Sequence, residues 1–270
     1  MAIAETITSL QNERIKAIRA LEMRKERRET GLFVAEGVSV IETARQRGIF
    51  PETLVHLAGS LDTAVARAIV TQAHAHGARI LEVSAAVLAK IAAKENPQSL
   101  IGVFHQRWSE LPARAAMART TTWLALEEVR DPGNLGTIIR TADAVGAAGV
   151  ILVGACCDPY SREAIRATMG SIFSVPLVAV TREAFLAFTK AWPGEVVGTA
   201  ITATEDVRMV TWREPVLLVM GSEGPGLSDG LTAAMSRLVR IPMVGRLDSL
   251  NLSVATALCL YEVRRRHLQI

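Results

Sequence analysis

The stretch from Val216 to Leu258 constrains the fold of this chain more than any other. Its first apolar run, Val216–Met220, ends abruptly at a glycine and predicts a buried strand. The next segment, Gly221-Ser222-Glu223-Gly224-Pro225-Gly226, is too rich in glycine and proline for a helix or a strand. A second apolar run, 238–243, is interrupted by Pro242, so the backbone is expected to leave the sheet there.

A long apolar helix is predicted to follow. The segment Arg246-Leu247-Asp248-Ser249-Leu250-Asn251 stands at its entry, where Ser and Asn are favoured as caps. Three loops of the stretch therefore fall at or near strand ends, which is where open α/β sheets place their ligand clefts. We expect the chemistry of the protein to lie at these loops.

Composition favours α/β layers. Of the 270 residues, 50% are hydrophobic and 4% aromatic, so the core is expected to consist of Ala, Val, Leu and Ile. The net charge of +3 is compatible with a polyanionic partner. The three cysteines, Cys156, Cys157 and Cys259, lack metal-ligand spacing and are predicted to be buried thiols, with no metal site. With neither a signal peptide nor a membrane-length apolar segment in view, we expect a cytoplasmic protein with no membrane partner.

Two domains are predicted from the alternation of strands and helices. Residues 1–110 contain strand patterns at 32–35, 54–57, 79–83 and 100–104, with helical segments between them, as in a compact α/β sandwich. Residues 111–121 lack clear periodicity and are interpreted as a linker. Residues 122–270 alternate again, with strands expected over 123–126, 150–153, 174–180, 196–200, 216–220 and 238–241, and helices over 135–145, 161–168, 182–192, 227–235 and 253–267. This order predicts a mostly parallel sheet covered on both faces.

A basic segment lies near the start of the chain. Residues 10–30 place Ile15, Ile18 and Leu21 at helical spacing, surrounded by cationic side chains. Two interpretations fit this pattern: a solvated helix with internal Glu pairs, or an RNA-binding face. The candidate RNA-binding residues are Arg14, Lys16, Arg19, Arg24, Lys25, Arg27 and Arg28.

The first candidate site follows the predicted strand at 123–126. A Pro-Gly turn leads to Asn134, at the expected start of a helix, where an asparagine is most often only a cap. Arg140 projects away from the apolar stripe of that helix, so packing does not require it. It is expected either to pair with Asp143 or to reach a phosphate or a ribose, because arginine is the preferred donor for such oxygens.

Two further sites lie in the stretch described first. Glu223, held among glycines, is interpreted with equal weight as an exposed loop acid or as a site carboxylate. Ser249, Asn251 and Ser253 cluster at a helix entry and exceed what a single cap requires. The five histidines lie away from all three sites, and no nucleotide fingerprint GxGxxG follows the first strand of this half.

Taken in order, these segments resemble a known family. NLGTIIRTADAVGAAGV, VMGSEGPGLS and VRIPMVGRLDSLNLSVATALCLYE resemble the three motifs of the SpoU (TrmH-like) RNA 2′-O-ribose methyltransferases, and DPYSREAIRATMGSIFSVPL is similar to a segment between the first two. The front half looks like the family's substrate-binding domain of ribosomal-protein L30e/L7Ae type, at FVAEG (33–37) and NPQSLI (96–101). The family usually has Gln-Gly where this chain has Gln98-Ser99.

The resemblance implies the SPOUT fold, an α/β sheet whose C-terminal segment threads through a loop as a deep trefoil knot, assembled as a homodimer. Periodicity alone does not predict a knot, because knots are nearly absent among folds. The implied cofactor is S-adenosylmethionine. By motif position its pocket would be lined, mostly through backbone atoms, by Thr199, Gly221, Ile241, Met243 and Leu250. The catalytic set would be Asn134, Arg140, Glu223, Ser249 and Asn251.

The function implied is methyl transfer to a ribose 2′-hydroxyl, with ribosomal RNA as the expected partner because of the L30e-like front half and the basic segment. A transfer-RNA substrate is the nearest alternative. A non-catalytic RNA-binding relative in ribosome assembly is a second one, although a pure binder has no need of the catalytic set. A nucleotide-dependent oxidoreductase is disfavoured by the missing glycine fingerprint.

Overall fold

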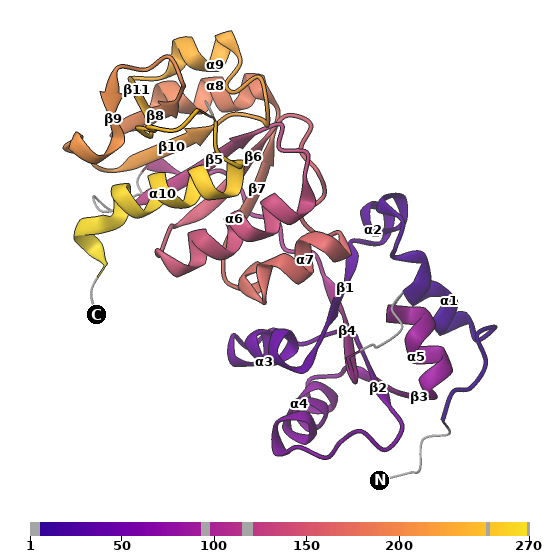
Figure 1. The fold of residues 1–270 in the computed structure, drawn as a ribbon. Coiled ribbons are helices and arrows are strands. Elements are labelled where there is room, and N and C mark those ends of the chain that lie inside the picture. Colours follow the sequence, from indigo (N-terminus) through magenta and orange to yellow (C-terminus); the bar gives the residue numbers. More distant parts are fainter. Residues whose placement is uncertain (1–5, 93–97, 115–120, 247–248, 269–270) are drawn as a thin grey trace. The chain divides into compact units, whose positions relative to one another are not determined.

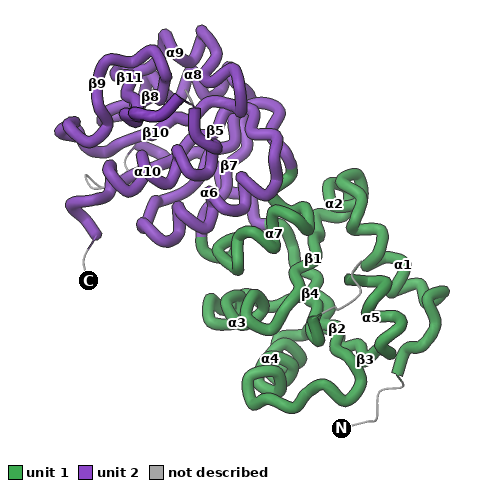
Figure 2. The backbone as a smooth tube through the Cα atoms, in the orientation of Figure 1, with its two compact units in different colours: residues 1–106, 158–174 green, residues 107–157, 175–270 purple. Residues whose placement is uncertain are grey.

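The computed structural model describes residues 6–92, 98–114, 121–246 and 249–268, so part of the predicted linker and part of the NPQSLI segment lie outside the description. The chain forms two compact units (Figure 2). The first comprises residues 1–106 and 158–174, and the second comprises residues 107–157 and 175–270. Within the described residues, no helix is long and apolar enough to cross a membrane.

The first unit is built on a four-stranded sheet with the order β1-β4-β2-β3. Strand β4 pairs antiparallel with β1 and β2, whereas β2 and β3 are parallel. Helices α3 and α4 lie on one side of the sheet, and α1 and α5 lie on the other (Figure 1). The bounds are α1 Glu13–Ala20, β1 Leu32–Glu36, α3 Val38–Gln46, β2 Thr53–Leu57, α4 Ala64–Ala75, β3 Arg79–Val83, α5 Ala85–Ala92 and β4 Leu100–His105. The predicted α/β sandwich is therefore confirmed.

A returning segment completes this unit. Helix α7 (Arg162–Thr168) and the 3₁₀ turn η2 (Ser171–Phe173) come from the chain between two strands of the second unit, yet they pack with the first. The ring of Phe33 lies 4.9 Å from that of Tyr160, and Phe104 lies 4.8 Å from Phe173. The alternation of strands and helices predicts one domain over 122–270, so this return was not predicted from the sequence.

The basic segment forms two helices, α1 and α2 (Arg24–Thr30), and not one. Arg27 is 4% exposed. Its guanidinium donates to the Leu21 and Glu22 carbonyl oxygens, at 2.8 Å each, and forms an ion pair with Asp158 at 2.7 Å. The assignment of Arg27 to the RNA-binding face is therefore corrected, because its charge is already neutralised inside the fold.

The second unit contains a seven-stranded sheet with the order β7-β6-β5-β10-β8-β11-β9, and every described pairing in it is parallel. Helices α8 and α9 cover one face through Phe185 and Leu231, and α6 packs beside α10 on the other (Figure 1). The bounds are β5 Thr122–Glu127, α6 Pro132–Ala144, β6 Gly149–Val153, β7 Leu177–Val180, α8 Arg182–Ala191, β8 Glu195–Thr199, β9 Glu205–Asp206, β10 Val216–Met220, α9 Asp229–Ala234, β11 Arg237–Arg240 and α10 Leu252–Arg264. The predicted parallel α/β fold is confirmed.

Several predicted bounds differ from those in the structure. Strand β7 begins at Leu177 and not at residue 174, because residues 171–173 form a 3₁₀ turn and Pro176 has no N–H for a sheet. Strand β9, only two residues long, was not predicted. The trefoil knot implied by the resemblance stays a prediction, since the segment between β11 and α10 includes residues outside the description.

Candidate active site

The loops that carry the predicted site residues meet at one edge of the second unit's sheet. Strands β5, β10, β8 and β11 are consecutive neighbours and run parallel, so their carboxyl ends lie together. The loop to α6 follows β5, the glycine-rich turn 221–228 follows β10, and the segment leading to α10 follows β11. This edge is where parallel α/β sheets place their ligands.

Asn134 is the centre of a hydrogen-bonded chain at this edge. Its Nδ2 donates to Glu223 Oε1 at 3.1 Å, and its Oδ1 accepts from Asn251 Nδ2 at 3.0 Å. The second carboxylate oxygen of Glu223 accepts from the backbone N–H of Arg130 at 3.3 Å. One residue from each of the three sequence motifs is thus joined in a single network. Glu223 is therefore half-buried and hydrogen-bonded, not a free loop acid, and its role as a site carboxylate stays a prediction.

Asp131, and not Asn134, caps the helix. The Asp131 side chain accepts from the backbone N–H of Asn134 at 2.6 Å, and Pro132 occupies the first helical turn. This cap was not predicted from the sequence, although an Asp followed by Pro is an ordinary helix start. Because Asp131 takes the capping role, the amide of Asn134 is left to bridge Glu223 and Asn251.

Asn251 does act as a cap, and this fixes its amide. Its Oδ1 accepts from the Ser253 backbone N–H at 2.9 Å, from Ser253 Oγ at 2.6 Å and from the Val254 N–H at 3.3 Å. The oxygen is therefore turned toward α10, and Nδ2 is turned toward Asn134. Ser249 lies two residues earlier and is exposed. The expected excess of polar residues at this helix entry thus has a structural account for Asn251 and Ser253.

Arg140 is exposed on α6 and lies outside this network. The described part of the chain holds no ion pair between Arg140 and Asp143, so the simple pairing considered from the sequence is not formed. Six residues separate Arg140 from Asn134, which corresponds to about 9 Å along a helix axis. Among the described residues, its guanidinium therefore has no ion-pair partner.

Three of the residues predicted to line the donor pocket lie at one edge of the sheet. Thr199 ends β8, Gly221 directly follows β10 and Ile241 directly follows β11, so all three stand at the same sheet edge. At Gly221 a Cβ atom would lie 2.0 Å from the carbonyl carbon of Gly226, so only glycine permits this turn. Two large apolar side chains, Met243 and Leu250, are 39% and 40% exposed.

Cysteine chemistry does not contribute to this site. Burial, together with the neighbouring thiol and nearby carboxylates, raises the pKa of Cys157 to about 12. Burial also raises the pKa of Cys156, and that of Cys259 to about 12. The three thiols are therefore protonated at neutral pH and are poor nucleophiles. Cys156 and Cys259 are buried, as predicted, whereas Cys157 is half-buried.

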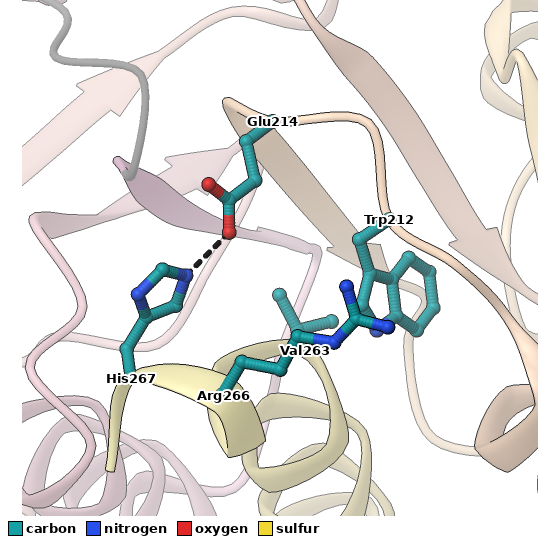
Figure 3. Close-up of a pocket in the computed structure, with 5 residues that line it drawn as sticks. All are labelled: Trp212, Glu214, Val263, Arg266 and His267. Carbon is teal, nitrogen blue, oxygen red and sulfur yellow. Dashed lines mark hydrogen bonds and ion pairs between the residues drawn. The ribbon is translucent and has the colours of Figure 1, made fainter. Parts of the chain in front are cut away.

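A separate cavity of about 330 Å³ lies at the C-terminal end of α10 (Figure 3). It is lined by Trp212, Glu214, Val263, Arg266 and His267, with a hydrogen bond between the side chains of Glu214 and His267. Glu214 precedes β10, whereas Gly221 follows it, so this cavity stands at the opposite edge of the sheet. It contains none of the predicted site residues.

Both parts of the chain match known families. Residues 121–261 match the SpoU rRNA Methylase family, and residues 12–102 match the MRM3-like substrate binding domain. The chain therefore belongs to the SpoU rRNA methylase family, and the resemblance carried by its three motifs is confirmed.

Individual relatives are similar over nearly the whole chain. The 23S rRNA (guanosine(2553)-2′-O)-methyltransferase RlmP of Bacillus subtilis is 31% identical over 96% of this chain and 98% of its own length. The AdoMet-bound rRNA methyltransferase from Sinorhizobium meliloti matches with a TM-score of 0.90 and 42% identity, covering 98% of this chain and 99% of that one. The SpoU methyltransferase AviRb from Streptomyces viridochromogenes, in complex with AdoMet, matches with a TM-score of 0.81 and 29% identity, covering 95% and 98%.

Proposed function

We propose that this chain transfers the methyl group of S-adenosylmethionine to a ribose 2′-hydroxyl of ribosomal RNA. The observation that carries the proposal is the hydrogen-bonded chain Glu223–Asn134–Asn251, whose links join residues 89 and 117 positions apart in the sequence. A protein that only bound RNA would have no need of such a network at the edge where ligands bind. Membership of the SpoU family and the names of full-length relatives support the same chemistry.

S-adenosylmethionine is the cofactor that the sheet edge fits. Thr199, Gly221 and Ile241 would present backbone atoms to it, and the exposed side chains of Met243 and Leu250 would cover its apolar parts. When bound, it supplies a methyl group that is already activated by the sulfonium charge. Two of the structural neighbours hold this cofactor.

The chain's own residues would prepare the acceptor. A ribose hydroxyl is a weak nucleophile and must lose its proton as it attacks, so its orientation and the charge on its oxygen decide the rate. A guanidinium group stays charged at neutral pH and binds phosphate oxygens well. We therefore assign Arg140 to an RNA phosphate and to the developing alkoxide. Asn134 and Glu223 hold the neighbouring loops in register, and Ser249 with Asn251 shapes the pocket.

Ribosomal RNA is the favoured substrate over transfer RNA. The support is the match of residues 12–102 to a substrate binding domain and the description of RlmP as a 23S rRNA enzyme. The exposed cations of α1 and α2, which include Arg14, Arg19 and Arg28, would bind the RNA backbone. Affinity for RNA is then expected to fall steeply as the salt concentration rises.

A methyl-transfer assay tests the function. Purified protein is incubated with S-adenosylmethionine labelled in the methyl group and with either ribosomal or transfer RNA, and the labelled nucleotide is located by its resistance to alkaline hydrolysis. We expect label on a ribose 2′-oxygen of ribosomal RNA. Label on transfer RNA alone would support the alternative substrate, and label on a base would contradict the proposed reaction. Absence of cofactor binding by calorimetry would support a non-catalytic RNA-binding protein.

We also propose that the chain acts as a homodimer through α10. Val254, Leu258 and Tyr261 follow one another at spacings of four and three residues, so they share one face of the helix. They are 47%, 45% and 55% exposed. An exposed apolar stripe of this kind is typical of an interface, and its two-fold copy on a second chain is a partner of matching chemistry.

A further inference from the structure

A buried carboxylate is hydrogen-bonded to the end of the turn that carries Glu223. Glu127 is the last residue of β5, and its side chain is only 3% exposed. It accepts hydrogen bonds from the Ser228 backbone N–H at 2.8 Å, from Ser228 Oγ at 2.7 Å and from Arg182 Nε at 2.9 Å. A buried carboxylate is costly unless it is paired in this way, so the arrangement constrains all three groups.

The turn from Gly221 to Ser228 is held at both ends. At its start the backbones of Ser222 and Gly226 exchange hydrogen bonds of 3.1 and 3.2 Å. At its end Ser228 caps α9 and is fixed by Glu127. Glu223 lies inside the loop closed by Ser222 and Gly226, and this loop is in turn tied to β5 through Ser228, so the position of Glu223 depends on both anchors. One anchor is provided by the turn itself, and the other is provided by the strand that leads into the Asn134 loop.

Arg182 extends the same connection to the next residue. Its guanidinium pairs with Glu127 at 2.9 Å and with Glu128 at 2.9 Å. Glu128 has a positive φ of 48°, which is unusual for a residue with a side chain. The first residues of the loop toward Arg130 and Asn134 are thereby held in a turn that they would not adopt alone.

We propose that Glu127, supported by Arg182, is a positioning residue for methyl transfer. It sets the distance between the β5–α6 loop and the 221–228 turn, and so keeps the Glu223 carboxylate within reach of the Asn134 amide. This inference rests on the proposed function, but it concerns residues that neither the sequence motifs nor the family resemblance singled out. Glu127 does not contact the reacting groups and acts through Ser228.

The chain offers a matched control for the stability of a buried carboxylate. Glu195, the first residue of β8, has a side chain that is 6% exposed, and it pairs with Arg237 at 2.7 Å. It stands at the amino-terminal edge of the same sheet, away from the site. Glu195→Gln therefore removes a similar buried charge without touching the turn.

Turnover and thermal unfolding are measured for wild type, Glu127→Gln and Glu195→Gln at a temperature at which all are folded. We expect both variants to unfold at lower temperature, and only Glu127→Gln to lower kcat, by at least about tenfold. The affinity for RNA is expected to remain unchanged. Equal kcat in the two variants, or a wild-type kcat in Glu127→Gln, would overturn the inference.

A second comparison uses Glu223→Gln as the background. If Glu127 acts through Glu223, the double variant with both Glu127→Gln and Glu223→Gln has the same kcat as Glu223→Gln alone. If Glu127 has a purely structural role, the fold-losses in kcat of the two single variants multiply in the double variant. Should Glu127→Gln fail to fold, Arg182→Gln replaces it, because Arg182 is 40% exposed and its removal is milder. A wild-type chain without methyl transfer would instead overturn the proposed function, and the inference with it.

Discussion

At the scale of single residues, the amide group explains why asparagine stands at positions 134 and 251. Asn134 donates to a carboxylate with one atom and accepts from a second amide with the other. Aspartate has no donor and would set two carboxylates against each other. Local sequence pattern predicted a helix cap at position 134, and at position 251 a cap within a polar cluster larger than one cap requires. The motif resemblance indicated a site, because capping preferences contain no information about contacts 89 or 117 residues away.

Arg140 gives the sharpest test at this scale. Arg140→Ala is expected to lower kcat at least about 100-fold, because it removes the charge assigned to the phosphate and the developing alkoxide. The unfolding temperature is expected to stay unchanged, since Arg140 is exposed and makes no ion pair in the described residues. Lys190→Ala, which removes an exposed cation on α8, serves as the control. Near-normal turnover of Arg140→Ala would remove this residue from the catalytic set.

At the scale of elements, local sequence pattern predicted the bounds of a strand well where turn-forming residues interrupt the apolar run. The bounds of β3 and β10 are those predicted, and β10 ends where a glycine follows it. The break between α1 and α2 could not be predicted in this way. It is stabilised by the Arg27 guanidinium on two carbonyl oxygens and by Asp158, a residue from a distant part of the chain. A tertiary contact of this kind overrides helical periodicity.

The two neighbouring arginines of α2 are therefore expected to behave differently. Arg27→Ala leaves Asp158 without its partner and is expected to cost about 3 to 5 kcal/mol of unfolding free energy. Arg28→Ala is expected to leave stability unchanged and to lower the slope of log affinity against log salt by about one, because one phosphate contact is lost. Urea unfolding and RNA-binding titrations over a salt series measure the two effects. An Arg28 variant with the wild-type salt slope would contradict RNA binding by this helix.

The exposed face of α10 makes a prediction about assembly. Leu258→Glu places a charge in the middle of the apolar stripe and is expected to weaken the dimer at least about tenfold. Sedimentation equilibrium measures the dissociation constant. Thr137→Glu, on the exposed surface of α6, adds the same charge outside the stripe as a control. A wild-type chain that sediments as a monomer would show that α10 is not a self-association surface.

At the scale of the whole molecule, the two units are not consecutive in sequence, because a segment from within the second half of the chain belongs to the first unit. Residues 158–174 lie between strands β6 and β7 of the second unit but complete the core of the first. The pattern at 161–168 predicts a helix but does not indicate which of the two cores its apolar residues enter. Burial against either unit produces the same helical periodicity, so only the tertiary fold shows which core the helix packs against.

This arrangement predicts how isolated pieces of the chain behave. A fragment of residues 1–106 lacks Tyr160 and Phe173, which pack on Phe33 and Phe104 in the aromatic cluster of the first unit. It also lacks Asp158, so Arg27 would be buried with only backbone partners. We expect the fragment to show a poorly dispersed amide NMR spectrum and to aggregate, since a small domain has little stability to lose. Joining residues 158–174 to residue 106 by a flexible Gly/Ser linker is expected to restore dispersion. The same linker joined to a scrambled 158–174 segment is the control, and equal spectra from the two fusions would show that the returning segment does not complete this core.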